Sequence, residues 1–573
     1  MTRRWGRYEI SGSRVRAVWP ELDAGLRLVV DGRPLEPALA RVEEGRDRLS
    51  WWLAGEGVEV ACRATPDGRV QATVAGRGRL QRVDLEQWAR GPGLGQPTVG
   101  DGWFAALEHP AAEGLGLAVD VDLSRGAYAT PVAVVRDAPA GHELSALWDE
   151  LDRVRARPPG LVVLANNWYQ LGYVGRMDEA SVAAEMEGFR DGVPVALDWY
   201  CLDDPWDGAW EDATGIWGRM DPRRFGGGLE ALQARGPVGL WISPWGGYFD
   251  RHDHRVAWGR AHGFEVTAGT WPRLCLAGDH YRAHVAESMG RFTAAGVGYW
   301  KIDGVHFDCA DGGHGHRVGP GGQTDQMDRF AALLGGVRAV NPATVLAFTS
   351  GSNPSPWWLQ HADFVWRGGL DDDAPDELPG SRHDRFATYI DTCLDALRTT
   401  GVPVSSIVTF SLIQNQAVAY RDDAAGLDEW ERHCWFLAGR GTHHHDLYVA
   451  PDSLSREEWA VLARALAWAR AHERTLARSR MVGGRPQAGE PYGFVSTSAA
   501  AGEAIVCLRN PSAQAQGVRV EVGGDLLDVE PVWGPPVVAD GAGHVAAELA
   551  PFEVALVTAR WRRRPGRRPG PPG

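Results

Sequence analysis

Lysine is almost absent from this chain of 573 residues, because all but one of its 59 basic residues are arginine. The exception, Lys301, lies in the apolar stretch Tyr299–Gly304. Lysine carries a compact ammonium on a slim stem, whereas arginine carries a planar fork, so the two are not equivalent in a tight site. The lone lysine predicts a pocket that admits an ammonium but not a guanidinium. A chance survivor of an arginine-rich composition is the alternative.

Cysteine is also scarce. The seven cysteines are scattered singly along the chain, and no Cys-x-x-Cys pair occurs. An odd number of unpaired cysteines argues against a disulfide framework and against a structural zinc site. We therefore expect no metal and no other cofactor.

Three further features are missing. The sequence that follows Met1 lacks the apolar run of a signal peptide, and no stretch is apolar enough to span a membrane. The net charge of −15 leaves no basic face for nucleic acid. These absences predict a cytoplasmic enzyme with neither a membrane nor a nucleic acid as partner, while a homo-oligomer stays open. The exception to the acidic balance is an arginine-rich tail, 561–573, which we expect to be disordered.

The chain is too long for one hydrophobic core, so we expect several domains. Residues 1–150 alternate short apolar runs with Asp-Gly turns, which predicts a β-sandwich. Residues 158–478 alternate strand-like and helix-like segments, and residues 479–560 return to strand patterns and predict a second, smaller sandwich. The strand candidates of the middle region are Leu161–Ala165, Val193–Leu197, Val238–Ile242, Gly298–Ile302, Thr344–Phe348, Phe364–Trp366, Val402–Thr409 and Thr442–Val449.

Eight strand–helix units in succession predict an α/β fold, specifically a (β/α)8 TIM barrel. A doubly wound open sheet is the alternative, but no glycine-rich dinucleotide motif follows any of the strands. In a barrel, functional side chains gather at the carboxyl ends of the strands. The polar and aromatic residues at the ends of the expected strands or directly after them are Asn167 and Trp168, Asp198 and Trp199, Trp241 and Trp245, Lys301 and Asp303, Ser350, and Trp366, Arg367 and Asp371.

Two carboxylates at such strand ends indicate glycoside chemistry, in which one attacks the anomeric carbon and the other protonates the leaving oxygen. Asp303 and Asp371 are the candidates, although Asp371 begins an acidic run that could be a solvated loop, with Asp363, Asp372 and Asp373 as substitutes. Lys301 shares the strand parity of Asp303, so its ammonium would keep that carboxylate ionised. The tryptophans offer flat amphipathic rings to sugar faces. The expected partner is therefore an oligosaccharide or another glycoside.

Four motifs in this order resemble the α-galactosidases of glycoside hydrolase family 36, which share a clan with family 27: Leu164–Trp168, an aspartate on the second strand, Gly-Leu-Trp-x-x-Pro at 239–244 and Lys-x-Asp at 301–303. The resemblance covers residues 160–375 and implies a retaining double displacement on terminal α-linked sugars. It implies that Asp303 is the nucleophile, that Asp371 is the acid/base and that Lys301 contacts the sugar. Arg367-x-x-x-Asp371 is similar to the corresponding pattern of family 27.

The chain departs from that family at two points. Family 36 carries an Asp-Asp pair for the sugar's O4 and O6, where this chain offers Asp198 followed by Trp199. The segment that reads the 2-position of the sugar is replaced by Thr349–Pro354. An α-galactoside is therefore the expected substrate, with an α-N-acetylgalactosaminide or another α-glycoside open.

Three other interpretations stay open. Histidine clusters at 252–254, 306–309, 314–316 and 443–446 could serve a metallohydrolase, although their spacing fits no helical His-Glu-x-x-His motif. A non-catalytic carbohydrate-binding protein could use a degenerate glycosidase scaffold. A transglycosylase would use the same two aspartates and differ only in the acceptor.

Overall fold

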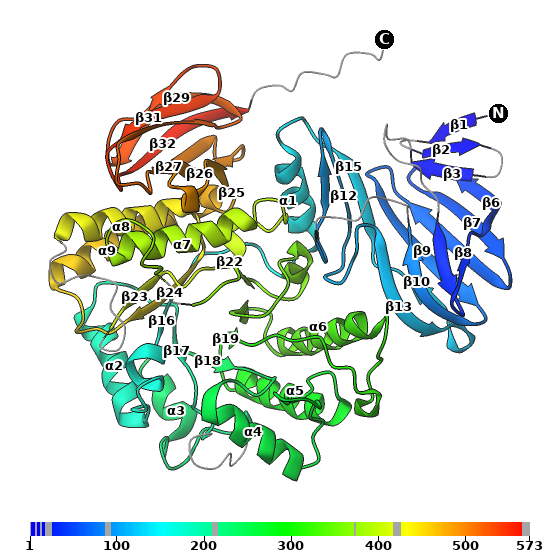
Figure 1. Cartoon of the computed structure of the whole chain (residues 1–573), viewed down its shortest axis with the longest axis horizontal. Helices are drawn as coiled ribbons and strands as arrows, with labels where there is room; N and C mark the ends of the chain where they lie inside the picture. The colour runs from blue at the N-terminus through cyan, green and yellow to red at the C-terminus, as the bar shows by residue number, and fades with distance from the viewer. Residues whose placement is uncertain are drawn as a thin grey trace.

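The computed structural model describes eight stretches of the chain, and the statements below concern these alone: residues 2–5, 8–11, 14–17, 26–85, 93–208, 216–371, 374–415 and 426–563. The chain forms an antiparallel β region, a central region of parallel strands and helices, and a second antiparallel β region (Figure 1). No helix within these stretches is long and apolar enough to cross a membrane.

The amino-terminal region consists of antiparallel sheets, as the alternating sequence predicts. The largest has the order β11-β12-β15-β9-β8-β7-β6, with β14 paired to β9, and the smaller ones are β13-β10-β4-β5 and β1-β2-β3. Apolar residues alternate along β8, whose buried positions face the core. The strands are β1 Thr2–Trp5, β2 Tyr8–Ser11, β3 Arg14–Ala17, β4 Arg27–Val30, β5 Arg33–Leu35, β6 Ala38–Glu44, β7 Leu49–Gly55, β8 Val58–Ala64, β9 Arg69–Gly76, β10 Arg79–Asp84, β11 Thr98–Gly100, β12 Trp103–Leu107, β13 Gly116–Asp122, β14 Tyr128–Ala129 and β15 Ala133–Asp137.

The central region is built on parallel strands in the order β20-β19-β18-β17-β16-β24-β23. A two-stranded parallel sheet, β21-β22, continues it through an isolated bridge between Ala347 and Phe364. The described strands thus form a curled parallel sheet and a short companion, not one continuous eight-stranded ring. Their bounds are β16 Val162–Asn166, β17 Trp199–Leu202, β18 Val238–Ile242, β19 Tyr299–Ile302, β20 Val345–Phe348, β21 Val365–Trp366, β22 Ile407–Val408, β23 Leu412–Gln414 and β24 His444–Val449.

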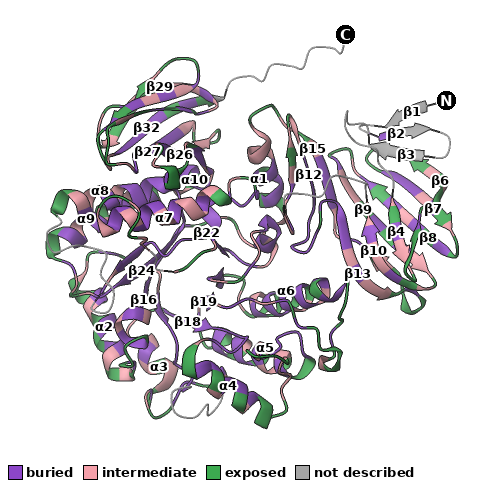
Figure 2. Ribbon diagram, viewed as in Figure 1, coloured by how far each residue is buried: buried purple, intermediate pink, exposed green. Residues whose placement is uncertain are grey.

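Helices surround these strands (Figure 1), namely α2 Glu179–Gly192, α3 Gly228–Gln233, α4 Phe249–Ala261, α5 Asp279–Ala294, α6 Gly322–Val340, α7 Arg382–Ala396, α8 Leu427–Arg440 and α9 Arg456–Ala471. Two further helices contact the flanking β regions: α1 Glu143–Val154 lies against β11 and β12, and α10 Glu473–Leu476 precedes the carboxyl-terminal strands. The strands β16, β18 and β24 are buried along their whole length (Figure 2). Continuous burial of this kind is typical of parallel strands covered by helices.

The second predicted strand, Val193–Leu197, is wrong. This segment is an extended connection after α2, and the strand begins six residues later than expected, at Trp199. Pro194 has no N–H to give to a central strand, which explains why the apolar run does not pair. The later strands lie close to their predicted bounds, except that Val402–Thr409 contributes only β22.

The carboxyl-terminal region contains two antiparallel sheets, β25-β26-β27-β32-β29 and β28-β31-β30, which share one cluster of buried valines. The prediction of a disordered tail over 561–573 is wrong for its first residues, because β32 continues to Arg563. The rest of that segment lies outside the described residues. The strands are β25 Ser479–Gly483, β26 Tyr492–Ser498, β27 Glu503–Arg509, β28 Gln516–Glu521, β29 Gly524–Trp533, β30 Val538–Ala539, β31 His544–Leu549 and β32 Val554–Arg563.

Candidate active site

Lys301 forms a buried ion pair on β19. Its Nζ lies 2.6 Å from Oδ2 of Asp203 and 3.0 Å from the hydroxyl of Tyr448, and the lysine is only 4% exposed. The ring centres of Phe410 and Tyr448 lie 5.5 and 5.3 Å from Nζ. The ammonium is thus enclosed by one carboxylate, one hydroxyl and two aromatic rings, which is the tight surrounding predicted for the lone lysine.

The charge of Lys301 is maintained in spite of its burial. Burial by itself lowers a lysine pKa, but the nearby carboxylates of Asp203, Asp446 and Asp303 more than offset it, so the pKa of Lys301 is raised. Asp446, on β24, is the opposite case: burial raises its pKa to about 7, although Lys301 acts to lower it. The pocket therefore holds a permanent cation and a carboxyl group that titrates near neutrality.

Asp303 follows β19 directly and accepts hydrogen bonds from several sides. Trp241 Nε1 donates to Oδ2 at 3.1 Å, while the backbone N–H of Gly304 and the hydroxyl of Tyr248 donate to Oδ1 at 2.9 and 3.3 Å. The hydroxyl of Ser350 also donates to Oδ1. These donors fix the direction of the carboxylate. Asp303 is only half-buried, so the carboxylate stays accessible.

Gly304 allows this arrangement. Its φ of 66° lies in the left-handed region, and a Cβ there would come within 2.9 Å of the Ser243 hydroxyl. A larger residue would therefore displace the backbone N–H that holds Asp303.

Asp371 lies on the loop that follows β21. Arg367 is 2% exposed and donates from Nη2 to the backbone oxygens of Leu370 and Asp371 at 2.6 and 3.0 Å. The hydroxyl of Tyr389 accepts the N–H of Leu370 at 2.6 Å. Arg367 thus supports the loop that carries Asp371, and its buried guanidinium is occupied by the backbone.

Asp303 and Asp371 both act on one neighbour, Tyr248. The pKa of Tyr248 is raised first by burial and then by both carboxylates, and the pKa of Tyr448 is raised by burial and, among others, by Asp203 and Asp371. Because charge effects of this kind act at short range, the two predicted catalytic aspartates border one region. Asp372 and Asp373, the substitutes considered for Asp371, lie outside the described residues, and Asp363 lies elsewhere.

The remaining predicted residues at this end have structural contacts. Asn167 is fully buried, and its Oδ1 accepts the backbone N–H of Asp203 at 2.9 Å. Trp168 lies under the guanidinium of Arg251, whose Cζ is 5.4 Å from its ring centre. Trp245 packs against aromatic neighbours, and Trp366 contacts the ring of Phe410 at 5.2 Å between centres.

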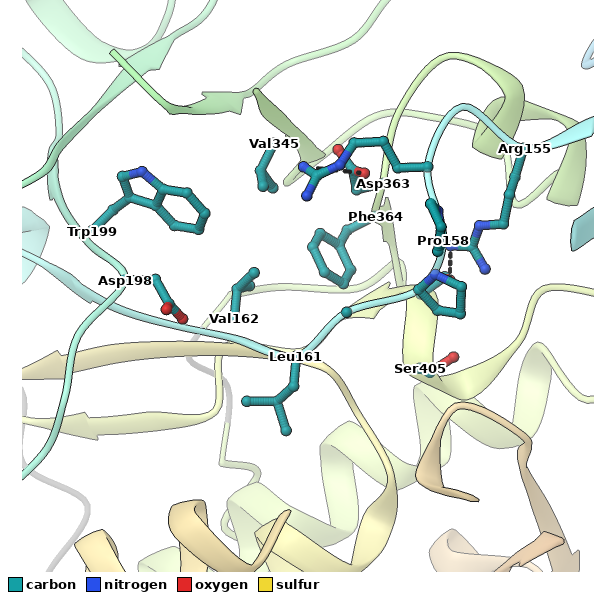
Figure 3. Close-up of a pocket in the computed structure, with 14 residues that line it drawn as sticks. Arg155, Pro158, Leu161, Val162, Asp198, Trp199, Val345, Asp363, Phe364 and Ser405 are labelled. Atoms are coloured by element: carbon teal, nitrogen blue, oxygen red, sulfur yellow. Dashed lines mark hydrogen bonds and ion pairs between the residues drawn. The ribbon is translucent and has the colours of Figure 1, made fainter. Parts of the chain in front are cut away.

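Asp198 and Trp199 do not lie at this end, so their predicted position is wrong. Asp198 precedes β17, and its Oδ2 accepts the N–H of Val163, near the start of β16, at 2.8 Å, and a hydrogen bond from Arg470 at 2.6 Å. Together with Asp363 they line a cavity of about 150 Å³ at the amino ends of the strands (Figure 3). The misplaced second strand caused this error, because it exchanged the two ends of β17.

The residues that follow β17 are Asp203 and Asp204, which the sequence reasoning missed. Asp203 pairs with Lys301, while Asp204 is buried with Arg251 and Arg255. Arg255 also pairs with Asp207 at 2.7 Å. The signal was an adjacent Asp-Asp directly after the apolar run 199–202, so the chain does carry an aspartate pair at a strand end. Tyr248 and Tyr448 were missed as well.

Most of the clustered histidines pack within the structure around the strands. His444 and His445 are buried on β24, and His443 is buried directly before it; burial lowers the pKa of each to about 3. His252 stacks on Trp271 with 4.9 Å between ring centres. His314 and His316 are different, because they meet Cys275 and Cys309.

The fold is shared with solved glycoside hydrolases. The α-galactosidase AgaA of family 36 from Geobacillus stearothermophilus superposes with a TM-score of 0.65 at 13% identity, covering 98% of this chain and 100% of that one. A variant of that enzyme in complex with stachyose gives a TM-score of 0.67 at 12% identity with the same coverage, and AgaB from the same organism gives 0.63 at 12%, covering 93% and 88%. The resemblance predicted from the motifs is thus confirmed for the fold.

Comparisons of sequence alone find no such likeness. No family model matches the chain, and no curated protein is similar to it. At 12–13% identity the likeness to these structures shows the fold alone.

Proposed function

We propose that this protein is a retaining glycoside hydrolase that cleaves terminal α-linked galactosides. The observation that carries the proposal is the group of Lys301, Asp203 and Asp303 at the carboxyl ends of β17 and β19, two parallel strands that flank β18. The neighbours in fold are α-galactosidases whose solved complexes include stachyose and raffinose. Because the carboxyl ends of the strands carry the chemistry in barrels, this group lies where a substrate would bind.

In the proposed reaction, Asp303 attacks the anomeric carbon and forms a glycosyl ester, while Asp371 protonates the leaving oxygen. Water, deprotonated by Asp371, then releases the sugar with its anomeric configuration retained. Trp241, Tyr248 and Ser350 hold the carboxylate of Asp303 in one direction, which aligns the attacking oxygen. Arg367 keeps the loop of Asp371 in position through its backbone.

We assign sugar binding to Asp203 and Lys301 in place of Asp198 and Trp199. One carboxylate oxygen of Asp203 accepts a hydrogen bond from the Lys301 ammonium. The adjacent aspartate, Asp204, forms ion pairs with two arginines. The resemblance to family 36 implies that such a pair holds the O4 and O6 hydroxyls. The proposed contributors to the walls of the site remain Trp168, Trp245, Trp366, Asn167 and Ser350. The substituent at the 2-position of the sugar, a hydroxyl or an N-acetyl group, stays open.

Two structural proposals accompany this function. We infer that the curled sheet and its β21-β22 companion are parts of one (β/α)8 barrel whose seventh strand is interrupted between β22 and β23. We also propose that the domains are 1–150, 158–478 and 479–560, with β-sandwiches at both ends.

The test is turnover of an aryl α-galactoside, with the first-formed anomer followed by NMR. We expect wild-type protein to release α-galactose, and Asp303→Asn to lose at least about 10⁴-fold in kcat, the scale on which loss of a nucleophile acts. Asp371→Asn should lose about 10² to 10⁴-fold on substrates with poor leaving groups.

The matched control is Asp308→Asn, on the same loop, whose side chain is 63% exposed and pairs with Arg273. It should keep wild-type turnover. A first product of inverted configuration contradicts the double displacement. Sugar binding without turnover by wild-type protein would instead indicate a carbohydrate-binding protein, and transfer products at high sugar concentration would indicate a transglycosylase.

A further inference from the structure

Two cysteines and two histidines meet beside the loop that begins at Asp303. One donor atom from each of Cys275, Cys309, His314 and His316 lies within 4.8 Å of all the others. Cys275, Cys309 and His316 are buried, and His314 is half-buried. Cys275 comes from the segment before α5, and the other three come from the segment between β19 and α6. The spacing in the sequence therefore does not predict that the four residues meet.

The separations suit a tetrahedral zinc ion. With Zn–S near 2.3 Å and Zn–N near 2.0 Å, ligand atoms of a tetrahedron lie roughly 3.3–3.8 Å apart. Cys309 Sγ lies 3.3 Å from His314 Nδ1, already the length of such an edge. A movement of about 1 Å by the widest pair would complete the tetrahedron.

Both imidazoles have outer partners of the kind that metal-binding histidines use. Nδ1 of His316 donates to the backbone oxygen of Arg317 at 2.8 Å, which leaves a lone pair on Nε2, and this buried Nε2 has no hydrogen-bond partner. Nε2 of His314 lies 3.4 Å from a carboxylate oxygen of Asp311. Such contacts fix the tautomer and orient the ring for the ion.

The two segments are held by backbone contacts that need no ion. Gln326, on α6, donates to the backbone oxygen of Cys309 at 3.0 Å and accepts its N–H at 3.1 Å. The backbone N–H of Cys275 donates to the backbone oxygen of Glu265 at 2.8 Å. Arg329 of α6 contacts the oxygen of Gly315 at 3.0 Å and Asp279 of α5 at 2.6 Å. The ligands are thus presented from positions fixed by two helices.

We propose that Cys275, Cys309, His314 and His316 bind one Zn²⁺ ion. Two thiolates neutralise its charge, and the mixed sulfur–nitrogen set of four favours zinc over calcium, magnesium or manganese. Four protein ligands leave no open position for water, so the ion has a structural role.

The ion would fasten the wall beside the proposed catalytic centre. Cys309 and Asp303 are on the same loop, which also carries His306 against the rings of Trp245 and Trp271 at 6.3 and 6.0 Å. Cys275 belongs to the segment that carries Trp271. The ion therefore joins the two loops that meet at His306. It is separate from the chemistry at Asp303, so its presence can be tested without any assay of turnover.

The test is the metal content of the full-length, tag-free protein by inductively coupled plasma mass spectrometry. We expect one zinc ion per chain in wild-type protein and its loss in Cys309→Ser and His316→Gln. Cys434→Ser, a buried free cysteine of α8, and His280→Gln, an exposed histidine of α5, are the controls and should keep the ion. Removal of zinc by a chelator should lower the melting temperature, and added Zn²⁺ should restore it.

A second measurement covers the case in which the ligand variants fail to fold. Chelated, reduced wild-type protein is titrated with Co²⁺, and we expect a thiolate-to-cobalt charge-transfer band with tetrahedral d–d intensity, displaced by Zn²⁺. If reduced wild-type protein takes up neither ion, or if both control variants lose the metal together with the ligand variants, the proposal is wrong. A Cys275–Cys309 disulfide in protein that carries no zinc also overturns it.

Discussion

The two ends of the parallel strands use the same residue types for different purposes. At the amino ends, Asp198 and Asp363 each accept a backbone N–H of a neighbouring strand, from Val163 and Leu346, and each also pairs with an arginine. At the carboxyl ends, Asp203 and Asp303 each accept a backbone N–H only from the residue that follows, and are otherwise held by a lysine and by side-chain donors, and Asp303 stays half-buried. A carboxylate that fastens a neighbouring strand is committed to the fold, whereas one held mainly by side chains can turn to a substrate.

The largest effect should come from Asp203→Asn, which tests the carboxyl end. It leaves the ammonium of Lys301 buried without its carboxylate, and removing one partner of a buried pair costs about 3–5 kcal/mol. We expect a clear loss in the free energy of unfolding, measured in urea, and a loss of turnover. Unchanged stability would show that Asp203 and Lys301 are not paired.

Lys301→Arg preserves the charge but changes its shape. The ammonium lies between Phe410 and Tyr448, where a planar fork does not fit. We expect kcat/KM for an aryl α-galactoside to fall by about 10² to 10³-fold, the scale of one lost charge-stabilising donor. The control at the amino end is Arg470→Lys, which should keep turnover. Near wild-type activity in Lys301→Arg would mean that the single lysine is a chance survivor of an arginine-rich composition.

Glu185 belongs to neither end and tests burial alone. Burial raises its pKa to about 7, although the Tyr200 hydroxyl donates to it at 2.7 Å. Folded protein therefore keeps a proton that the unfolded chain has lost above about pH 4.5, so the free energy of unfolding falls as pH rises from there to about 7.

In Glu185→Gln the free energy of unfolding should fall less with rising pH, by on the order of 2 kcal/mol, given about 1.4 kcal/mol per pKa unit. The measurement is urea unfolding of both proteins at pH 5 and pH 8. Parallel pH profiles for the two proteins would mean that Glu185 is ionised in the folded state.

Asp198→Asn should have the smallest effect and completes the comparison. Its carboxylate is partly exposed, so weakening its bonds to Val163 and Arg470 should cost about 1 kcal/mol. We expect a slightly lower melting temperature with unchanged kcat and KM. A fall in kcat equal to that of Asp203→Asn would place substrate at the amino ends and reverse the comparison.

The sequence located much of the candidate site because its signals are local. Lys301 and Asp303 share a face by strand parity, and the β18 and β24 strands are close to their predicted bounds. The error at Asp198 arose because an apolar run that contains Pro194 imitates a strand, and only pairing with β16 and β18 identifies β17 as the strand.

The sequence by itself predicted the alternation of strands and helices in the central region and a Lys-x-Asp motif at the end of a strand, because both signals come from residues that are neighbours in the chain. Only the tertiary structure decided that Asp203 is the partner of Lys301, that Arg367 supports the loop of Asp371, and that Cys275 meets Cys309, His314 and His316. These are contacts between segments far apart in the chain, and they depend on how loops pack on helices, which no local pattern encodes.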